Sequence, residues 1–97
     1  MAEHIERKPF KAGDIVQHFK HERYPADSPM YTYRILGYAT HSETRETLVL
    51  YEALYDMNSE DTLKVFARPL DMFMSKVDKE KYPDIRQEYR FELLSRG

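Results

Sequence analysis

A polar segment between two apolar, β-forming runs is the feature that most constrains how this chain folds. The segment covers residues 41–46, and the runs on either side cover residues 30–40 and 47–55. Two such runs joined by a short polar stretch predict an antiparallel hairpin. The segment contains no Gly, Asn or Asp, which are the residues that tight turns usually use. We therefore expect its side chains to do something besides allowing the chain to turn.

Shorter β-forming runs flank this hairpin in the sequence. Residues 14–19 and 63–67 have the β-branched and aromatic character of strands. A final strand is expected from about residue 89, preceded by a turn of helix at most. Gly37, inside the longest run, indicates a bulge or a sharp bend. About five short strands predict a mainly β fold with one short helix, a small SH3-like, partly open twisted barrel.

The remaining segments complete the expected organisation. Pro69 suits the first turn of a short helix over residues 70–73. The chain has 97 residues, which is enough for one domain and one core, expected over residues 13–97. The segments expected to be irregular are a flexible N-terminal arm at 1–12, a loop at 21–29 and a turn at 56–61.

Composition excludes several classes of protein. Cysteine is absent, so no disulfide framework, thiolate zinc site or cysteine nucleophile is possible. The apolar runs are too short to span a bilayer and the N-terminus lacks the apolar core of a secretory signal, so we expect a cytoplasmic protein. The net charge is −2, with Lys and Arg spread along the chain. This balance gives no general reason to expect nucleic-acid or membrane binding, although it leaves a local basic patch open.

The alternation of residues 47–55 assigns them to two faces of a strand. Glu52 should point outward, which places Leu48, Leu50 and Leu54 on its side and Val49, Tyr51, Ala53 and Tyr55 on the other. Both faces are then largely apolar. Either the strand is covered on both sides or one face is a contact surface.

An ordered set of short motifs resembles one known family. The motifs are His18-Phe19-Lys20, Tyr33-Arg34-Ile35-Leu36-Gly37-Tyr38-Ala39, His41-Ser42-Glu43-Thr44-x-Glu46, Val49-x-Tyr51-x-Ala53-Leu54-Tyr55, Arg68-Pro69-x-x-Met72-Phe73 and Lys81-Tyr82-Pro83-x-x-x-Gln87-x-Tyr89-Arg90-Phe91. Together they resemble the bacterial domain-of-unknown-function family numbered 1653, over roughly residues 13–94. The resemblance implies a compact domain without an established activity, and it assigns no site residues. The position before Arg-Pro that is usually Trp in the family is Phe66 here.

The hairpin segment and two strand positions supply a candidate ligand site. Its residues are His18, His41, Ser42, Glu43, Thr44, Tyr51 and Arg68. An arginine and several hydroxyls can fix a polar or anionic group, while aromatic faces stack on a planar one. We therefore expect a non-enzymatic binding module for a nucleotide, a modified base, an RNA segment or a peptide. No cofactor and no membrane contact are expected.

Other interpretations of the same residues stay open. His41 can act as a general base, with Glu43 or Glu46 as its partner, in a small hydrolase or transferase, although no nucleophile elbow is present. The hydroxyls of Ser42 and Thr44 can instead bond to the backbone of a tight turn in a purely structural role. A third alternative is an interaction domain, monomeric or homodimeric, that pairs through a strand edge.

Two further groups have both a functional and a structural interpretation. A metal could be held by His18, His21 and His41, but residues three apart on a strand point to opposite faces, so we expect no metal site. Arg68 can bind a carboxylate or phosphate of a ligand. It can equally form an internal ion pair with Glu43, Glu46 or Glu52.

Overall fold

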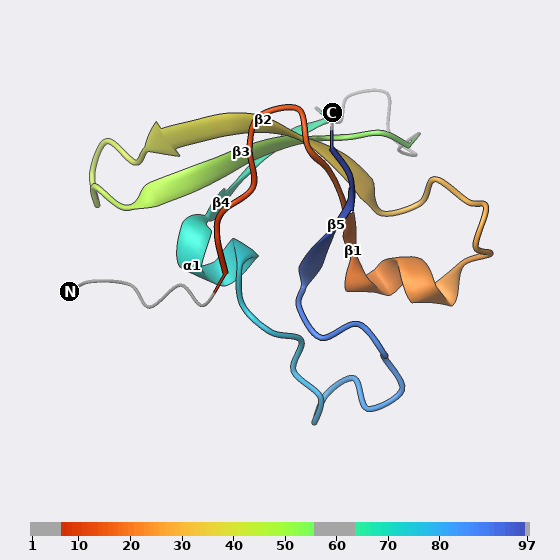
Figure 1. Cartoon of the computed structure of the whole chain (residues 1–97). Helices are drawn as coiled ribbons and strands as arrows, with labels where there is room; N and C mark the ends of the chain where they lie inside the picture. The colour runs from red at the N-terminus through yellow and green to blue at the C-terminus, as the bar shows by residue number, and fades with distance from the viewer. Residues whose placement is uncertain (1–6, 56–63, 97) are drawn as a thin grey trace.

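The computed structural model describes residues 7–55 and 64–96, and β-strands dominate this part of the chain (Figure 1). The strands are β1 (Ile15–His18), β2 (Thr32–Thr40), β3 (Thr47–Ala53), β4 (Val65–Pro69) and β5 (Phe91–Ser95). A 3-10 helix, η1 (Phe19–Arg23), follows β1, and a short helix, α1 (Leu70–Phe73), follows β4. Among the described residues, no helix is long and apolar enough to cross a membrane.

All five strands belong to one antiparallel sheet. Their order is β4-β3-β2-β1-β5, so β4 and β5 lie at the two edges and do not pair with each other. Figure 1 shows the sheet curving over α1, which lies on its concave side. The prediction of a small, mainly β domain with one short helix and a sheet that does not close is confirmed.

The bend predicted at Gly37 is present in β2. The pairing of β2 with β3 shifts between Ile35, opposite Tyr51, and Gly37, opposite Leu50, so that Leu36 is the extra residue of a bulge. Gly37 has a φ of 152°, which L side chains rarely adopt. The bulge bends the long strand between its core half and its hairpin half.

Two segments differ from the sequence expectation. The loop expected over residues 21–29 begins with the end of η1, which a search for periodicity misses because 3-10 helices are too short to show one. The final strand, expected from about residue 89, starts at Phe91 as β5, while Tyr89 makes an isolated bridge to Lys76. Residues 85–90 contain no helix, which agrees with the expectation of one turn at most. The turn expected over residues 56–61 lies outside the described residues.

Aromatic side chains dominate the core on the concave face of the sheet. The main cluster of buried residues contains Val16, Tyr33, Ile35, Val49, Tyr51, Ala53, Phe73, Met74 and Phe91. The rings of Phe73 and Phe91 stack at 3.9 Å with an interplanar angle of 7°. Because Phe73 comes from α1 and Phe91 from β5, this stack joins the helix to an edge strand.

The opposite face of the sheet is apolar but only partly covered. Leu48, Leu50 and Leu54 of the expected outward set are half-buried. Val65, on neighbouring β4, is 52% exposed. The outward position of Glu52 is confirmed, since it forms an exposed ion pair with Arg34 at 2.9 Å.

The described part of the expected N-terminal arm, residues 7–12, has no strand or helix but contacts the core. The Arg7 guanidinium donates to the carbonyl oxygens of Phe91 at 3.0 Å and Met74 at 3.3 Å. Its carbon lies 3.8 Å from the centre of the Tyr89 ring. Phe10 packs edge-on against Phe73. Residues 1–6 of the expected arm lie outside the described part.

Replacing Phe73 should show how much the aromatic stack contributes. We expect Phe73→Ala to lower the free energy of unfolding by about 3–5 kcal/mol, because a buried ring leaves a cavity that the sheet cannot refill. Urea unfolding followed by circular dichroism measures this. Met72→Ala is the matched control, since Met72 is 45% exposed in the same helix and should change stability by at most about 0.5 kcal/mol. Equal losses in the two variants would contradict the assignment.

Candidate functional site

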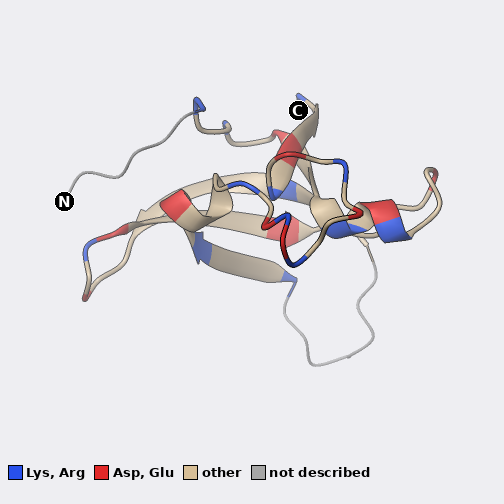
Figure 2. Ribbon diagram, turned by 90° about the horizontal axis from the view of Figure 1, so that it is seen from below, with Lys and Arg blue, Asp and Glu red and all other residues tan. Residues whose placement is uncertain are grey.

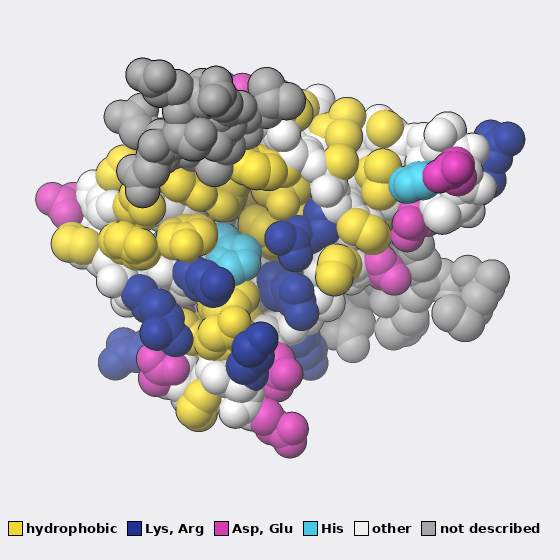
Figure 3. All heavy atoms as spheres, turned by 180° about the vertical axis from the view of Figure 1, so that it is seen from behind, with side chains coloured by type: hydrophobic (Ala, Val, Ile, Leu, Met, Phe, Trp, Pro, Cys, Tyr) yellow, Lys and Arg dark blue, Asp and Glu magenta, His cyan; other side chains and the backbone are white. Residues whose placement is uncertain are grey.

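A pocket of about 280 Å³ lies where β1, η1, β4 and the segment before β5 meet. Four cationic side chains line it, from Lys20, Arg68, Lys81 and Arg90. The only carboxylate among its lining residues belongs to Asp78. Figure 3 shows a cluster of Lys and Arg side chains around a histidine in the middle of this face. The local positive charge contrasts with the net charge of −2 for the whole chain.

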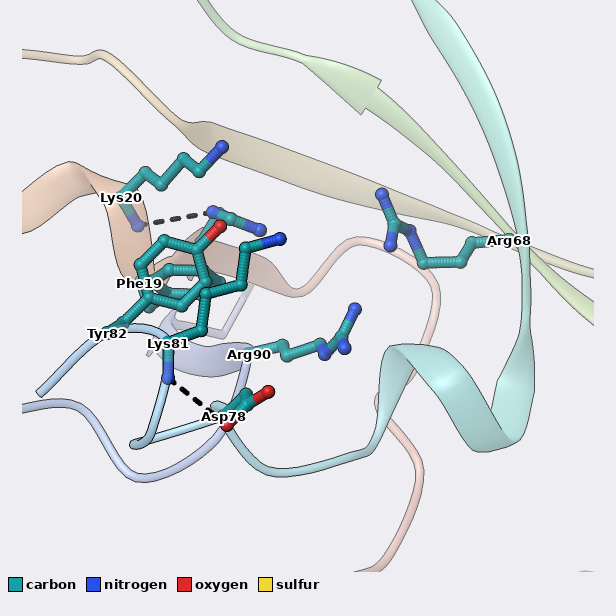
Figure 4. Close-up of a pocket in the computed structure, with 8 residues that line it drawn as sticks. Phe19, Lys20, Arg68, Asp78, Lys81, Tyr82 and Arg90 are labelled. Atoms are coloured by element: carbon teal, nitrogen blue, oxygen red, sulfur yellow. Dashed lines mark hydrogen bonds between the residues drawn. The ribbon is translucent and has the colours of Figure 1, made fainter. Parts of the chain in front are cut away.

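The four cations come from η1, β4 and the segment before β5 and converge on one space. Figure 4 shows Arg68 extending from β4 on the side opposite Lys20 and Lys81, with Arg90 between them. Figure 2 shows that the sheet itself carries few charged residues, while η1 and the nearby irregular segments carry many. The pocket therefore lies between the sheet, which contributes His18 of β1 and Arg68 of β4, and the segments outside it, which carry the other cations.

The cations of the pocket are not neutralised by acidic side chains of the described residues. In the part of the chain that the structure describes, no carboxylate pairs with the side chains of Lys20, Arg68 or Arg90. Arg68 Nε donates to the Tyr51 hydroxyl at 3.2 Å. The Asp78 carboxylate accepts the backbone N–H groups of residues 80 and 81, so it is used by its own turn. The pocket keeps an excess of positive charge.

His18 lies at the inner wall of the pocket in its neutral form. Its ring packs against Phe19 at 4.3 Å and Phe91 at 5.0 Å. Burial, followed by the positive charges of Arg68, Lys20 and Arg90, lowers the pKa of His18 from 6.5 to about 3. Its Nδ1 accepts the Lys20 backbone N–H at 3.2 Å, which assigns the remaining proton to Nε2. The pocket therefore contains a neutral N–H donor among its cations.

Aromatic rings form another wall. Tyr82 lies 4.8 Å from Phe19, and Phe19 is buried with Val77 and Ile85 in a second small core. The Lys81 ammonium lies 5.6 Å from the Tyr82 ring centre. This small core supports η1 and the segment around residue 82, which carry two of the cations.

Side-chain hydrogen bonds hold the irregular segment before β5 in place. The Glu22 carboxylate accepts the backbone N–H groups of Arg86 at 2.8 Å and Gln87 at 2.7 Å. The Gln87 amide donates to the Gln17 carbonyl at 3.1 Å, and its oxygen lies 3.0 Å from His21 Nε2. Buried polar groups are usually satisfied in this way. These bonds attach the segment to η1 and β1 and so position Arg90.

The structure divides the residues of the predicted site into two groups. His18, Tyr51 and Arg68 come together at the pocket, through the lining and the hydrogen bond described above. Residues 41–44 lie at the hairpin tip, at the far end of β2 from its pairing with β1 (Figure 1). With about 3.3 Å per residue, the nine residues of β2 place His18 roughly 25 Å from the tip. The Arg68 backbone starts nearer the tip, since it pairs with Val49 opposite Tyr38, but its side chain bonds to Tyr51.

At the hairpin tip, His41 bonds to the backbone of its own turn. Its Nδ1 accepts the N–H groups of Glu43 at 3.1 Å and Thr44 at 3.2 Å. The Thr44 hydroxyl donates to the Glu46 carboxylate at 3.1 Å. Arg45 takes the positive φ, 68°, that glycine or asparagine usually supplies. The side chains of His41 and Thr44 therefore stabilise a turn that has no Gly, Asn or Asp. Ser42 is exposed.

Three cations of the pocket were not among the predicted site residues: Lys20, Lys81 and Arg90. The signal that could have found them is their place inside the family-like motifs around His18 and at the C-terminal end. Among the described residues, no group of three His, Asp or Glu side chains could hold a metal ion.

Comparisons with known proteins define the family and no activity. A family model described as "Protein of unknown function (DUF1653)" matches residues 14–93, which is most of the chain. No curated protein and no solved structure matches the chain.

Removing the His41 imidazole should destabilise the hairpin. His41→Ala leaves two turn N–H groups without their acceptor, so we expect a loss of about 1 kcal/mol in unfolding free energy, as for the loss of a helix cap. Chemical denaturation measures the loss. Ser42→Ala, the neighbouring exposed position, is the control and should be close to neutral. An unchanged stability in His41→Ala would contradict the structural role.

His18 should remain neutral in the folded protein under mildly acidic conditions. Below pH 6.5 the unfolded state binds a proton that folded His18 does not bind until about pH 3, so stability should fall as the pH drops through this interval. Imidazole carbon shifts measured by NMR follow the ring directly. In His18→Gln the same acidification should cost less stability than in the wild type. A His18 midpoint near 6.5 would show that the ring is not shielded from protons.

Proposed function

The chain belongs to the DUF1653 family of proteins of unknown function, and we propose that it is a non-enzymatic module that binds a phosphate-bearing ligand in the pocket around His18. One observation carries the proposal. Four cationic side chains from different parts of the chain converge on one concavity with a single carboxylate at its edge. In a protein with more acidic than basic residues, such a concentration of positive charge, with which no carboxylate of the described residues forms an ion pair, favours an anionic ligand.

The types of donor in the pocket suit phosphate. Arg68 and Arg90 have planar guanidinium groups, which bind two phosphate oxygens at once. Lys20 and Lys81 add compact charges. Neutral His18 adds a directed Nε2–H donor. A phosphate group has enough acceptor oxygens to use several of these donors together.

The support for Arg68 as a ligand-binding residue is the geometry of its guanidinium. Its Nε is held by the Tyr51 hydroxyl, while its carbon lies 5.8 Å from the centre of the Phe91 ring. Because these contacts already orient the guanidinium, it loses less conformational entropy on binding a ligand than a freely rotating side chain would. Glu52, a partner considered for Arg68, instead pairs with Arg34 on the other face of the sheet.

Catalysis centred on His41 has less support than binding. The Nδ1 of its ring accepts two backbone N–H groups, and no carboxylate of the described residues bonds to the ring. A general base in a hydrolase is normally oriented by such a partner. Binding at the pocket is therefore the better-supported function.

The proposal is tested by titrating the ¹⁵N-labelled protein with pyrophosphate, an anion without any organic part. Amide shifts should cluster around residues 18–20, 81 and 90. Arg90→Gln should weaken binding about tenfold or more, because hydrogen bonds to charged groups contribute more than neutral ones. Arg34→Gln removes the same charge on the opposite face and should bind like the wild type.

Two results would overturn the proposal. One is the absence of localised shifts at millimolar pyrophosphate. The other is equal weakening by Arg90→Gln and Arg34→Gln, because binding would then depend on total charge rather than on the pocket.

A further inference from the structure

A series of aromatic rings continues from the pocket across the neighbouring surface. The His18 ring, which lines the pocket, lies 5.6 Å from the Tyr31 ring. Tyr31 in turn lies 5.7 Å from both Tyr24 and Tyr55. Figure 3 shows hydrophobic side chains, which include tyrosine in its colouring, extending from the central histidine beside the Lys and Arg cluster. The positive pocket and the aromatic surface are therefore continuous through His18.

The aromatic surface is open to solvent at its outer end. Tyr24 is 41% exposed, although a ring of this size gains from burial. Tyr31 and Tyr55 are half-buried, and the Tyr55 hydroxyl bonds to that of Tyr33 at 2.8 Å. The inner rings are thus fixed by the core while Tyr24 presents area to a ligand.

The backbone at Tyr31 is held in an uncommon conformation. Its φ is 65°, a left-handed value that is rare for a large side chain. The surrounding bonds impose it, since the Tyr31 carbonyl accepts from His18 N–H at 2.9 Å and the Thr32 N–H donates to Pro29 at 3.1 Å. Such conformations persist where the structure over-determines them, often at binding sites. Here the result is that the Tyr31 ring lies between His18 and Tyr24.

We propose that the pocket around His18 and the surface formed by Tyr24, Tyr31 and Tyr55 make one site for a nucleotide unit, with phosphate in the pocket and an unpaired base stacked on the tyrosines. This inference rests on the proposed phosphate binding and names the ligand class. Basic residues beside solvent-accessible aromatic rings are the combination that binds single-stranded nucleic acid. The same chemistry occurs in a free nucleotide and in a strand.

The observations favour a nucleotide over other phosphate carriers. The adjoining rings offer a larger stacking area than one phosphorylated side chain covers. A base has a planar aromatic face that can stack on such rings. The chain is acidic overall, which disfavours duplex binding, because that binding depends on neutralising many phosphates. Bases in a duplex are also stacked on each other and present no free face. One or two unpaired nucleotides fit these conditions.

The test compares ADP with pyrophosphate, which share a diphosphate but differ in the base. Isothermal titration and ¹H–¹³C spectra of the tyrosine rings measure affinity and contact. We expect ADP to bind roughly 5- to 100-fold more tightly than pyrophosphate, the range for stacking of one base. Ring-current shifts should appear at Tyr24 and Tyr31.

Substitutions at Tyr24 isolate the stacking contribution. Tyr24→Ala should remove most of the advantage of ADP and leave pyrophosphate affinity unchanged, while Tyr24→Phe should keep both. Tyr38→Ala is the matched control, because Tyr38 is exposed to 39% on the hairpin half of β2. It should bind both ligands like the wild type.

Each failure has a distinct form. If pyrophosphate and ADP bind equally and Tyr24→Ala has no effect, the stacking inference is overturned and the phosphate pocket stands. If neither binds, the proposed function fails as well. A phosphotyrosine peptide that binds more tightly than ADP, and loses its affinity in Tyr24→Ala, would assign the site to phosphopeptides and overturn the nucleotide class. A short single-stranded oligonucleotide, compared with ADP, then distinguishes a strand from a free nucleotide.

Discussion

The buried ring of Phe91 is the contact on which the rest of this structure depends. It stacks on Phe73 and lies 5.9 Å from Tyr33 and 5.6 Å from Tyr51, so one side chain joins the edge strand β5 to α1, β2 and β3. The same ring contacts His18 and lies under the Arg68 guanidinium. The packing that stabilises the sheet therefore also positions two donors of the candidate site, His18 and Arg68. A substitution at Phe91 would change the core and the site together.

The sequence was sufficient to predict the regular part of the fold. Alternating apolar runs identified the hairpin formed by β2 and β3, Gly37 marked the bulge and Pro69 marked the start of α1. These features depend on neighbours in the sequence, where periodicity and backbone preference are reliable guides. The segment before β5 is different, because its conformation is fixed by bonds from distant side chains such as Glu22 to the backbone of residues 86 and 87.

The candidate site follows the same division. His18, Tyr51 and Arg68 could be selected from strand sequences, because strands display their polar and aromatic residues in a regular order. Lys81 and Arg90 lie outside the strands, in an irregular segment of mixed charge that normally indicates only a solvated surface, so only their place in the family-like motifs marks them. Residues 41–44 stand where tight turns normally carry Gly, Asn or Asp, and the structure gives His41 and Thr44 that turn-forming role. The unusual residues of this turn therefore indicate how the turn is stabilised, at the hairpin end of the sheet.

The neutral state of His18 has a consequence for how the pocket responds to its surroundings. A histidine usually gives a phosphate site a charge that changes around neutral pH. Here burial and the neighbouring positive charges keep the ring uncharged well below that range. His18 therefore brings no change in the charge of the pocket across physiological pH. A phosphate monoester, whose second pKa is about 6, changes its own charge in that interval, so the pH profile of binding would report the ionisation of the ligand and distinguish terminal phosphates from phosphodiesters.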